Sequence, residues 1–149
     1  LVIAATRADV HGVIDVPWGG TSTSVVRMTP TTEGEVRNVL TNVLGEQWPN
    51  CKLAIVVDDD IDAMSPKDII WSISTRVDAA ARALIIPNAK GPPIEPTTRC
   101  TGKSPRDVLS SKWGIDATKP AVQHPESRTR FERTLPPHNG AVDLQEFLG

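Results

Sequence analysis

Near its amino end the chain has two short runs that predict the strands of a β-hairpin. Val13 and Val16 are prominent in the first run, and the second alternates hydrophobic and polar residues. The first run is Val10–Pro17 and the second is Ser22–Thr29. Between them lies Trp18-Gly19-Gly20-Thr21, whose two glycines can adopt backbone angles that other residues resist. We therefore expect two neighbouring antiparallel strands joined by a tight turn.

The next segment has the spacing of an amphipathic helix. Pro30-Thr31-Thr32 opens it, with Thr31 or Thr32 as the capping residue. Glutamates follow in the first turn, where the helix dipole favours negative charge. Gly45 is a natural end point. One apolar face is predicted, made of Val36, Val39, Leu40, Val43 and Leu44.

A second helix is predicted between two apolar runs. Lys52–Val57 is apolar after its lysine, which is typical of a strand buried on both faces of a parallel sheet. Ser65-Pro66-Lys67-Asp68 is a helix start, with serine as the cap and proline at the first position. Leu84–Pro87 predicts another short buried strand, joined to the first by a right-handed crossover. The buried face of the helix is predicted to be Ile69, Ile70, Ile73 and Val77.

Beyond Pro87 the composition changes. Asn88–Pro105 and Ala117–Asn139 are rich in Pro, Thr, Lys and Arg and predict irregular structure, and Asp143–Leu148 could form a last short helix. The order of elements predicts an α/β fold, with three layers and a mixed, partly parallel sheet. We expect this domain to occupy residues 1–120. Residues 121–149 are expected to form an extended, Pro-rich tail that serves as an interface.

Composition narrows the classes of function. The length of 149 residues suits one domain, and a net charge of −2 gives no sign of a nucleic-acid or anionic-membrane partner. No apolar run approaches the roughly 18 residues that span a bilayer. Cys51 and Cys100 lack metal-site spacing. We expect unpaired thiols in a cytoplasmic protein, with a disulfide between the two as the alternative. Because the chain starts at Leu1 rather than Met, we expect it to be a piece of a longer gene product.

The first apolar strand ends in an acidic turn, Asp58 to Asp62, with the sequence DDDID. Hard cations bind carboxylate oxygens, and ligands of α/β sheets collect at the carboxyl ends of strands, so a metal site is one interpretation. The spacing does not match an EF-hand loop. The alternative is structural: among Asp58, Asp59 and Asp60, one caps the turn and another pairs with Arg76 or Arg82.

Several blocks of the sequence resemble the C-terminal domain of the UbiD family of decarboxylases. In order along the chain they are GGTSTSVVRM, KLAIVVDDDID, PKDIIWSISTRVD, ALIIP and SKWGIDATKP, which together cover most of Val10–Pro120. WSISTRVD and WGIDATKP are the most specific, because ordinary sheet-and-helix patterning does not require them. Lys90–Arg106 departs from the family pattern and looks like an insertion.

The resemblance implies an enzyme that uses prenylated FMN, with a divalent cation (Mn²⁺ or Mg²⁺) and K⁺, to decarboxylate aromatic, heteroaromatic or α,β-unsaturated acids reversibly. Such chemistry belongs to the cofactor, and the protein orients it. The family's catalytic Glu–Arg–Glu set lies in an upstream flavin-binding domain that has no match in this sequence. We therefore assign no catalytic, cofactor-binding or metal residue. We expect a carboxy-lyase fragment that is inactive by itself.

The resemblance also implies which surfaces matter. The family's C-terminal domain closes one side of the active site and supplies oligomer contacts, so the flavin domain and further copies of the chain are the expected partners. Gly19–Ser24 corresponds to the region facing flavin and substrate, which makes Trp18, Thr21 and Ser22 candidates for lining the cleft. An ordinary hairpin turn with a packing tryptophan is the alternative. VPWGGTS and IIPNAKG resemble the family's soluble aromatic-acid decarboxylases more than its quinone-pathway members, which implies a small aromatic acid as substrate. A purely structural assembly module and a stand-alone metal-binding domain are the rival functions.

Overall fold

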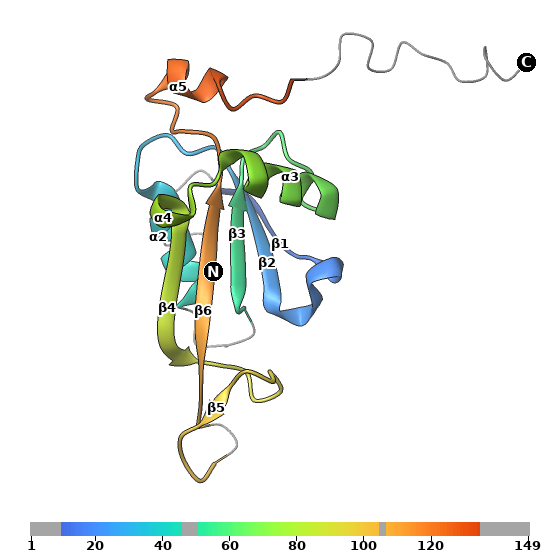
Figure 1. Ribbon diagram of the computed structural model, residues 1–149, viewed down its shortest axis with the longest axis vertical. Coiled ribbons are helices and arrows are strands. Elements are labelled where there is room, and N and C mark those ends of the chain that lie inside the picture. Colours follow the sequence, from blue (N-terminus) through green and yellow to red (C-terminus); the bar gives the residue numbers. More distant parts are fainter. Residues whose placement is uncertain (1–9, 46–50, 105–106, 135–149) are drawn as a thin grey trace, which may run out of the picture.

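A mixed six-stranded sheet forms the centre of the molecule (Figure 1). The computed structural model describes residues 10–45, 51–104 and 107–134. The sheet has the order β1-β2-β3-β6-β4, with β5 paired to β6. β2, β3 and β6 run parallel, and the other strands are antiparallel to their neighbours. The strands are β1 (Val10–Asp15), β2 (Thr23–Met28), β3 (Leu53–Val57), β4 (Ala83–Lys90), β5 (Arg99–Cys100) and β6 (Val108–Ala117).

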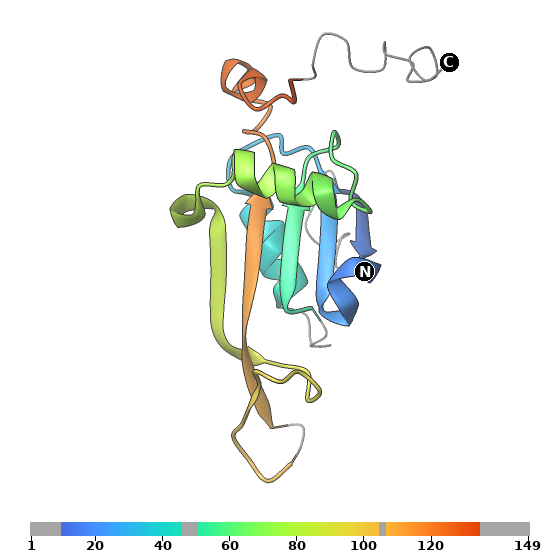
Figure 2. The same cartoon turned by 45° about the vertical axis from the view of Figure 1, so that its right-hand side comes forward.

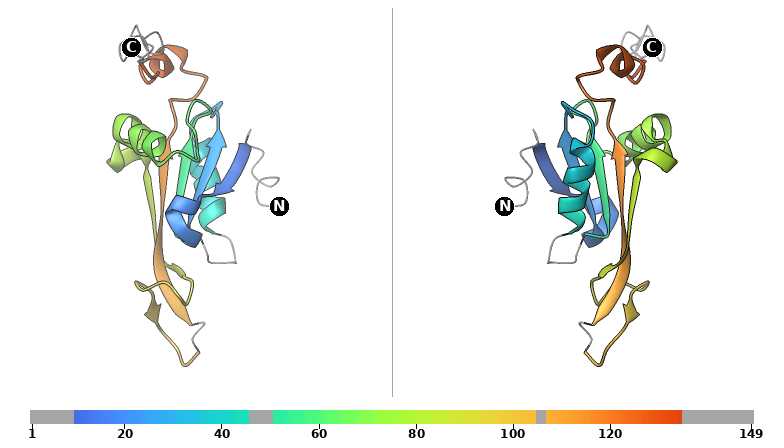
Figure 3. Two further views of the ribbon diagram at one scale, coloured as in Figure 1. Left: turned by 90° about the vertical axis from the view of Figure 1, so that its right-hand side faces the viewer. Right: turned by 90° about the vertical axis from the view of Figure 1, so that its left-hand side faces the viewer.

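Helices cover both faces of this sheet, which confirms the three-layer α/β prediction. The edge-on views of Figure 3 place α2 (Glu35–Leu44) on one face and α3 (Pro66–Arg76) on the other. α3 crosses the sheet near the carboxyl ends of the parallel strands (Figure 2). The short elements are η1 (Pro17–Ser22), α4 (Ala79–Arg82) and α5 (Pro125–Thr129). Within the described parts of the chain, no helix is long and apolar enough to cross a bilayer.

The alternation of β3 divides the hydrophobic core in two. Ile55 and Val57 point to the α3 side and pack with Ile69. Ala54 and Val56 point to the α2 side and pack with Leu40. Successive residues of a strand face opposite sides of a sheet, so a strand buried on both faces needs an unbroken apolar run. This explains the sequence LAIVV.

The hairpin, the two principal helices and the strand at 53–57 confirm the sequence predictions, with local differences. Ser65 caps α3 by accepting a hydrogen bond from the Asp68 amide, as expected. The cap of α2 is Gly34, with φ 87°, rather than Thr31 or Thr32. Those two threonines instead donate to the carboxylate of Glu35.

The apolar face predicted for α3 is partly wrong. Ile69 is buried, but Ile70 is 62% exposed, and the polar residues Ser72 and Arg76 take buried positions on the inner face. The helical spacing was correct, yet it could not distinguish an isoleucine on the flank from an arginine that is buried by its partners. The buried arginine proves central to the candidate site.

Sequence reasoning missed β6, the longest strand. β6 lies between β3 and β4, parallel to β3 and antiparallel to β4. β4 therefore runs opposite to β3 and is not its neighbour, so the predicted crossover between these two strands is wrong. The parallel crossover that does exist joins β2 to β3 through α2. β6 escaped notice because polar residues interrupt VLSSKWGIDA at Ser110, Ser111 and Lys112, two of which are nonetheless buried.

β4 is an edge strand rather than a buried one. Ile85 is 69% exposed, and the pairing with β6 shifts register between Ile86 and Ala89. Pro87 and Asn88, the latter with φ 55°, occupy this irregularity. β4 also runs to Lys90, into the segment predicted to be irregular.

Part of the predicted tail lies against the domain. Residues 119–134 pass the carboxyl ends of β3 and β6 and include α5, whereas the possible helix at Asp143–Leu148 lies outside the described residues. Backbone hydrogen bonds join Val122 to Pro30 and Gln123 to Thr31. The domain boundary at residue 120 and the interface role of the tail remain predictions.

Candidate functional site

The loop predicted to line a cleft forms the 3₁₀ segment η1. Trp18 is 37% exposed and Ser22 is half-buried, while the side chain of Thr21 lies outside what the structure describes. Gly20 adopts φ 65°, which disfavours side-chain-bearing residues. A Cβ on Gly19 would lie 2.5 Å from Thr23 Cβ, so this position also needs glycine. The double glycine thus holds the loop in a shape that leaves Trp18 accessible.

This loop and the acidic turn lie at opposite ends of the sheet. η1 leads into the amino end of β2, where the Ser22 carbonyl accepts a hydrogen bond from the Lys52 amide. Asp58 follows the carboxyl end of β3. The structure therefore does not bring Trp18 and Ser22 together with the aspartates, and the two features need separate explanations.

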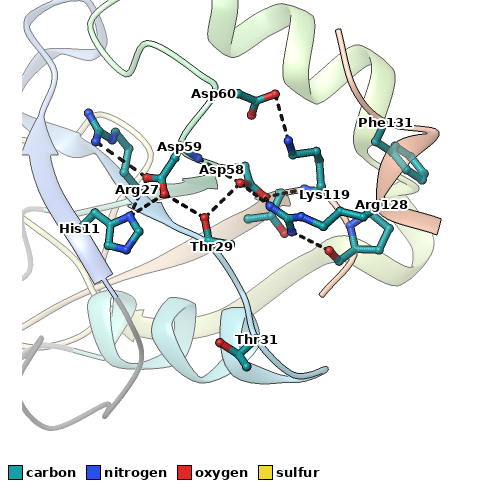
Figure 4. A network of polar contacts seen from close by, with 12 residues as sticks. His11, Arg27, Thr29, Thr31, Asp58, Asp59, Asp60, Lys119, Arg128 and Phe131 are labelled. Atoms are coloured by element: carbon teal, nitrogen blue, oxygen red, sulfur yellow. Dashed lines mark hydrogen bonds and ion pairs between the residues drawn. The ribbon is translucent and has the colours of Figure 1, made fainter. Parts of the chain in front are cut away.

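Asp58 is the centre of the acidic turn and is almost completely buried (Figure 4). Arg128 reaches it from α5 with two hydrogen bonds of 2.7 and 2.8 Å. Further donors are the Thr29 hydroxyl and the backbone amides of Asp59 and Lys119. A buried carboxylate is costly unless it is paired and hydrogen-bonded, and here both oxygens are satisfied.

Asp59 points the other way, toward the β1–β2 hairpin (Figure 4). Its carboxylate lies 2.7 Å from His11 Nδ1, accepts a hydrogen bond from the Thr29 hydroxyl and lies 3.8 Å from an Arg27 nitrogen. Burial raises the pKa of Asp59, but the contacts with His11, Thr29 and Arg27 outweigh it and leave that pKa below its usual value. Thr29 thus bridges Asp58 and Asp59.

Asp60 pairs with the buried Arg76 of α3. The guanidinium donates two hydrogen bonds, of 3.0 and 2.6 Å, and Lys119 lies 3.5 Å from the same carboxylate. Burial raises the pKa of Asp60, but Arg76 and Lys119 more than offset it and bring the pKa below its usual value. Arg82, the other partner considered from sequence, contacts Asp116 and the Thr118 carbonyl instead.

The arrangement does not fit a divalent cation. Each of Asp58, Asp59 and Asp60 turns to a different basic side chain, Arg128, His11 and Arg76 respectively, so their oxygens do not converge on one point. Across the described ranges, no three His, Cys, Asp or Glu side chains are grouped as a metal site. The pairing of Asp60 with Arg76 is one of the two pairings considered from the sequence, and a purely structural role for the whole turn stays a prediction.

A nearby cavity does not fit a flavin mononucleotide either. It has a volume of about 240 Å³ and lies between the start of α2, α4 and residues 118–121. Pockets for small-molecule ligands usually measure about 300–1,000 Å³. Glu33 and Asp116 line it together with Arg37, Arg82 and Lys119, so its charges are mixed rather than suited to a phosphate.

Comparison with known proteins assigns the fold to a family. Residues 2–117 match the profile of the 3-octaprenyl-4-hydroxybenzoate carboxy-lyase C-terminal domain. The chain belongs to the UbiD family. The family assignment confirms the resemblance drawn from WSISTRVD and WGIDATKP, and it places the hairpin, the acidic turn and β6 in one domain of a decarboxylase family.

Curated UbiD-type relatives are longer than this chain. An anhydromevalonate phosphate decarboxylase of Methanothermobacter thermautotrophicus is 34% identical over 110 residues, which are 74% of this chain and 23% of the relative. A phenolic acid decarboxylase of Sedimentibacter hydroxybenzoicus is 29% identical over 147 residues, or 99% of this chain and 28% of the relative. The chain thus spans about a quarter of these proteins.

Solved structures agree with this assignment. The UbiD-class enzyme HmfF from Pelotomaculum thermopropionicum, in complex with FMN, has a TM-score of 0.76 at 26% identity, covering 98% of this chain and 31% of that one. The closed form of vanillic acid decarboxylase from Sedimentibacter hydroxybenzoicus has a TM-score of 0.68 at 26% identity, covering 98% and 29%.

Sequence reasoning missed the partners that complete the acidic turn. Arg128 lies 70 residues from Asp58, in a segment predicted to be irregular, and Thr29 lies 29 residues before it. The sequence signal that could have indicated these partners is the group of three arginines at 128, 130 and 133. Only the fold shows which of them meets which carboxylate.

Proposed function

We propose that this chain is the C-terminal domain or small subunit of a UbiD-type enzyme that reversibly decarboxylates an aromatic, heteroaromatic or α,β-unsaturated carboxylic acid with prenylated FMN. Family membership carries the proposal, together with relatives named as phenolic acid, vanillic acid and anhydromevalonate phosphate decarboxylases. The flavin, the divalent cation and K⁺ would be held by a partner flavin-binding domain or subunit, because the family's flavin-binding domain has no match in this sequence. The free thiols of Cys51 and Cys100 support a cytoplasmic location.

The part of this chain that we assign to the active-site cleft is the loop containing Trp18, Thr21 and Ser22. The partly exposed indole of Trp18, in the loop whose turn requires Gly20, gives a large apolar surface suited to an aromatic substrate or a flavin edge. The role of the loop would be to shape the cleft and exclude water, not to transfer protons. Residues that only position a substrate can still change rates strongly, since misplacement by about 1 Å can cost about 100-fold.

The test uses the complete enzyme that contains this chain. Trp18→Ala and Thr21→Val are expected to lower kcat/KM by about tenfold or more, while flavin content and oligomer mass stay unchanged. Val13→Ala is the control, because Val13 is similarly exposed (39%) but lies on β1, outside the loop. The isolated chain, mixed with prenylated FMN and aromatic acids, should show no turnover. Turnover by the isolated chain would place the chemistry in this domain and overturn the proposal.

An assembly module is the second candidate, favoured by an apolar row on the sheet. Trp113 pairs in register with Leu53 on one side and Ile85 on the other, and Trp113 and Ile85 are 42% and 69% exposed. Exposed apolar patches commonly mark interaction surfaces. If assembly is the main role, Ile85→Asp should reduce the oligomer mass measured by light scattering. Ile94→Asp, at a still more exposed position (85%) off this row, should not. Unchanged mass for both variants would argue against it.

A further inference from the structure

Residues 119–134 form a strap that is bound to the carboxyl end of the sheet by hydrogen bonds. Arg128 binds the buried Asp58 through two hydrogen bonds and also donates to the Pro120 carbonyl within the strap. Val122 and Gln123 donate their amides to the connection between β2 and α2. Asp58 is 2% exposed, so loss of Arg128 would leave a carboxylate buried without its counter-charge.

The same strap is fastened to α3 by two other arginines. Arg76, from α3, donates to the Phe131 carbonyl at 3.0 Å while it also holds Asp60. Arg133, from the strap, donates to Asp68 at 2.9 Å. The hydrogen bond from Arg133 brings the pKa of Asp68 below its usual value.

Trp71 lies between these two arginines. Its ring centre is 5.1 Å from the Arg76 guanidinium carbon and 4.6 Å from that of Arg133, both within the range of cation–π attraction. One guanidinium belongs to α3 and the other to the strap. The indole therefore joins the two elements in addition to the hydrogen bonds.

We propose that the strap is a clamp that couples α3 to the carboxyl end of the sheet. It holds the sheet through Asp58, the β2–α2 connection through backbone hydrogen bonds, and α3 through Phe131 and Arg133. A protein segment or ligand that displaces the strap therefore also loosens α3. Because the coupling uses only contacts within this chain, it does not depend on the proposed decarboxylase function.

Hydrogen exchange of the intact protein tests the clamp. Arg128→Ala should speed exchange about tenfold or more at the amides of residues 119–134 and also in α3, 66–76. Arg130→Ala is the matched control, because its exposed side chain makes no polar contact with any described residue. Faster exchange confined to 119–134, with α3 as in the unchanged protein, would overturn the coupling.

A second variant keeps the test decisive if Arg128→Ala fails to fold. Arg133→Gln removes only the partly exposed contacts with Asp68 and Trp71, so the fold should persist by circular dichroism. Exchange in α3 should rise several-fold, and the amides near Val122 should keep their protection. Unchanged exchange in α3 would show that the strap rests on the helix without restraining it.

Discussion

Gly114 of β6 lies directly beneath Leu40 of α2, and the leucine side chains leave no room for a Cβ at residue 114. A Cβ on Gly114 would lie 2.8 Å from Leu40 Cδ2 and 3.2 Å from Leu44 Cδ1. This contact explains the glycine in the WGID block, which the sequence identified as a family signature without giving its physical cause.

Gly114→Ala should therefore destabilise the domain. Overpacking of a close-packed interface costs about 1–3 kcal/mol, and urea unfolding would measure it. Gly12→Ala is the control, because a Cβ there meets nothing within 4 Å; its effect should stay within about 0.5 kcal/mol. Equal stability of the two variants would contradict the packing explanation.

Glu95 should make stability dependent on acid pH. Burial raises its pKa, but hydrogen bonds from Lys52, Thr97 and Ser110 outweigh this and bring the pKa to about 2. A carboxyl with a depressed pKa stabilises the fold above the pKa of the unfolded chain. That contribution is lost as the pH falls from about 4.5 toward about 2.

Glu95→Gln should flatten the fall in unfolding free energy over that pH window, as measured by urea titrations at several pH values. The matched control is Glu33→Gln, since the Glu33 side chain is 65% exposed. If Glu95→Gln follows the same pH profile as the unchanged protein, the Lys52–Glu95 contact does not persist in solution.

Much of the fold was predictable because local patterns carry it. Three elements could be predicted from neighbouring residues alone: the β1–β2 hairpin, the apolar strand β3, and the start of α3 at Ser65-Pro66. β6 was not predictable in this way, because Ser110 and Lys112 are buried by partners elsewhere, namely Glu95 and the Leu44 carbonyl. The partners of the acidic turn could be predicted only in part. Arg76 lies near the turn in sequence, whereas Arg128 is distant in sequence and is brought to the turn by the fold.

The cap of α3 gives a third prediction. The Ser65 hydroxyl accepts a hydrogen bond from the Asp68 amide at 3.3 Å. Ser65→Ala should therefore lower the free energy of unfolding by about 1 kcal/mol. Ser65→Asp should retain the cap and most of the stability. Thermal unfolding of both variants would decide the matter, and equal losses would show that the cap hydrogen bond contributes little.

Arg76 and Asp60 give a fourth prediction. Arg76→Met should lower the free energy of unfolding by up to about 3 kcal/mol. This is the lower end of the range for breaking a buried ion pair, and we expect it because the Asp60 side chain is 32% exposed. In a double-mutant cycle with Asp60→Asn, the two losses should be less than additive. Full additivity would show that Arg76 stabilises the domain through Trp71 and Phe131 rather than through Asp60.

Irregular pairing of both edge strands of the sheet, β1 and β4, affects how copies of the chain can associate. Pro87 and Asn88 break the pairing of β4, and β1 shifts register between Val10 and Gly12. A regular, unprotected edge would serve as a template on which further strands could add without limit. With both described edges irregular, the addition of further strands there is disfavoured, and the side chains on the two faces become the more favourable surfaces for a contact of limited stoichiometry.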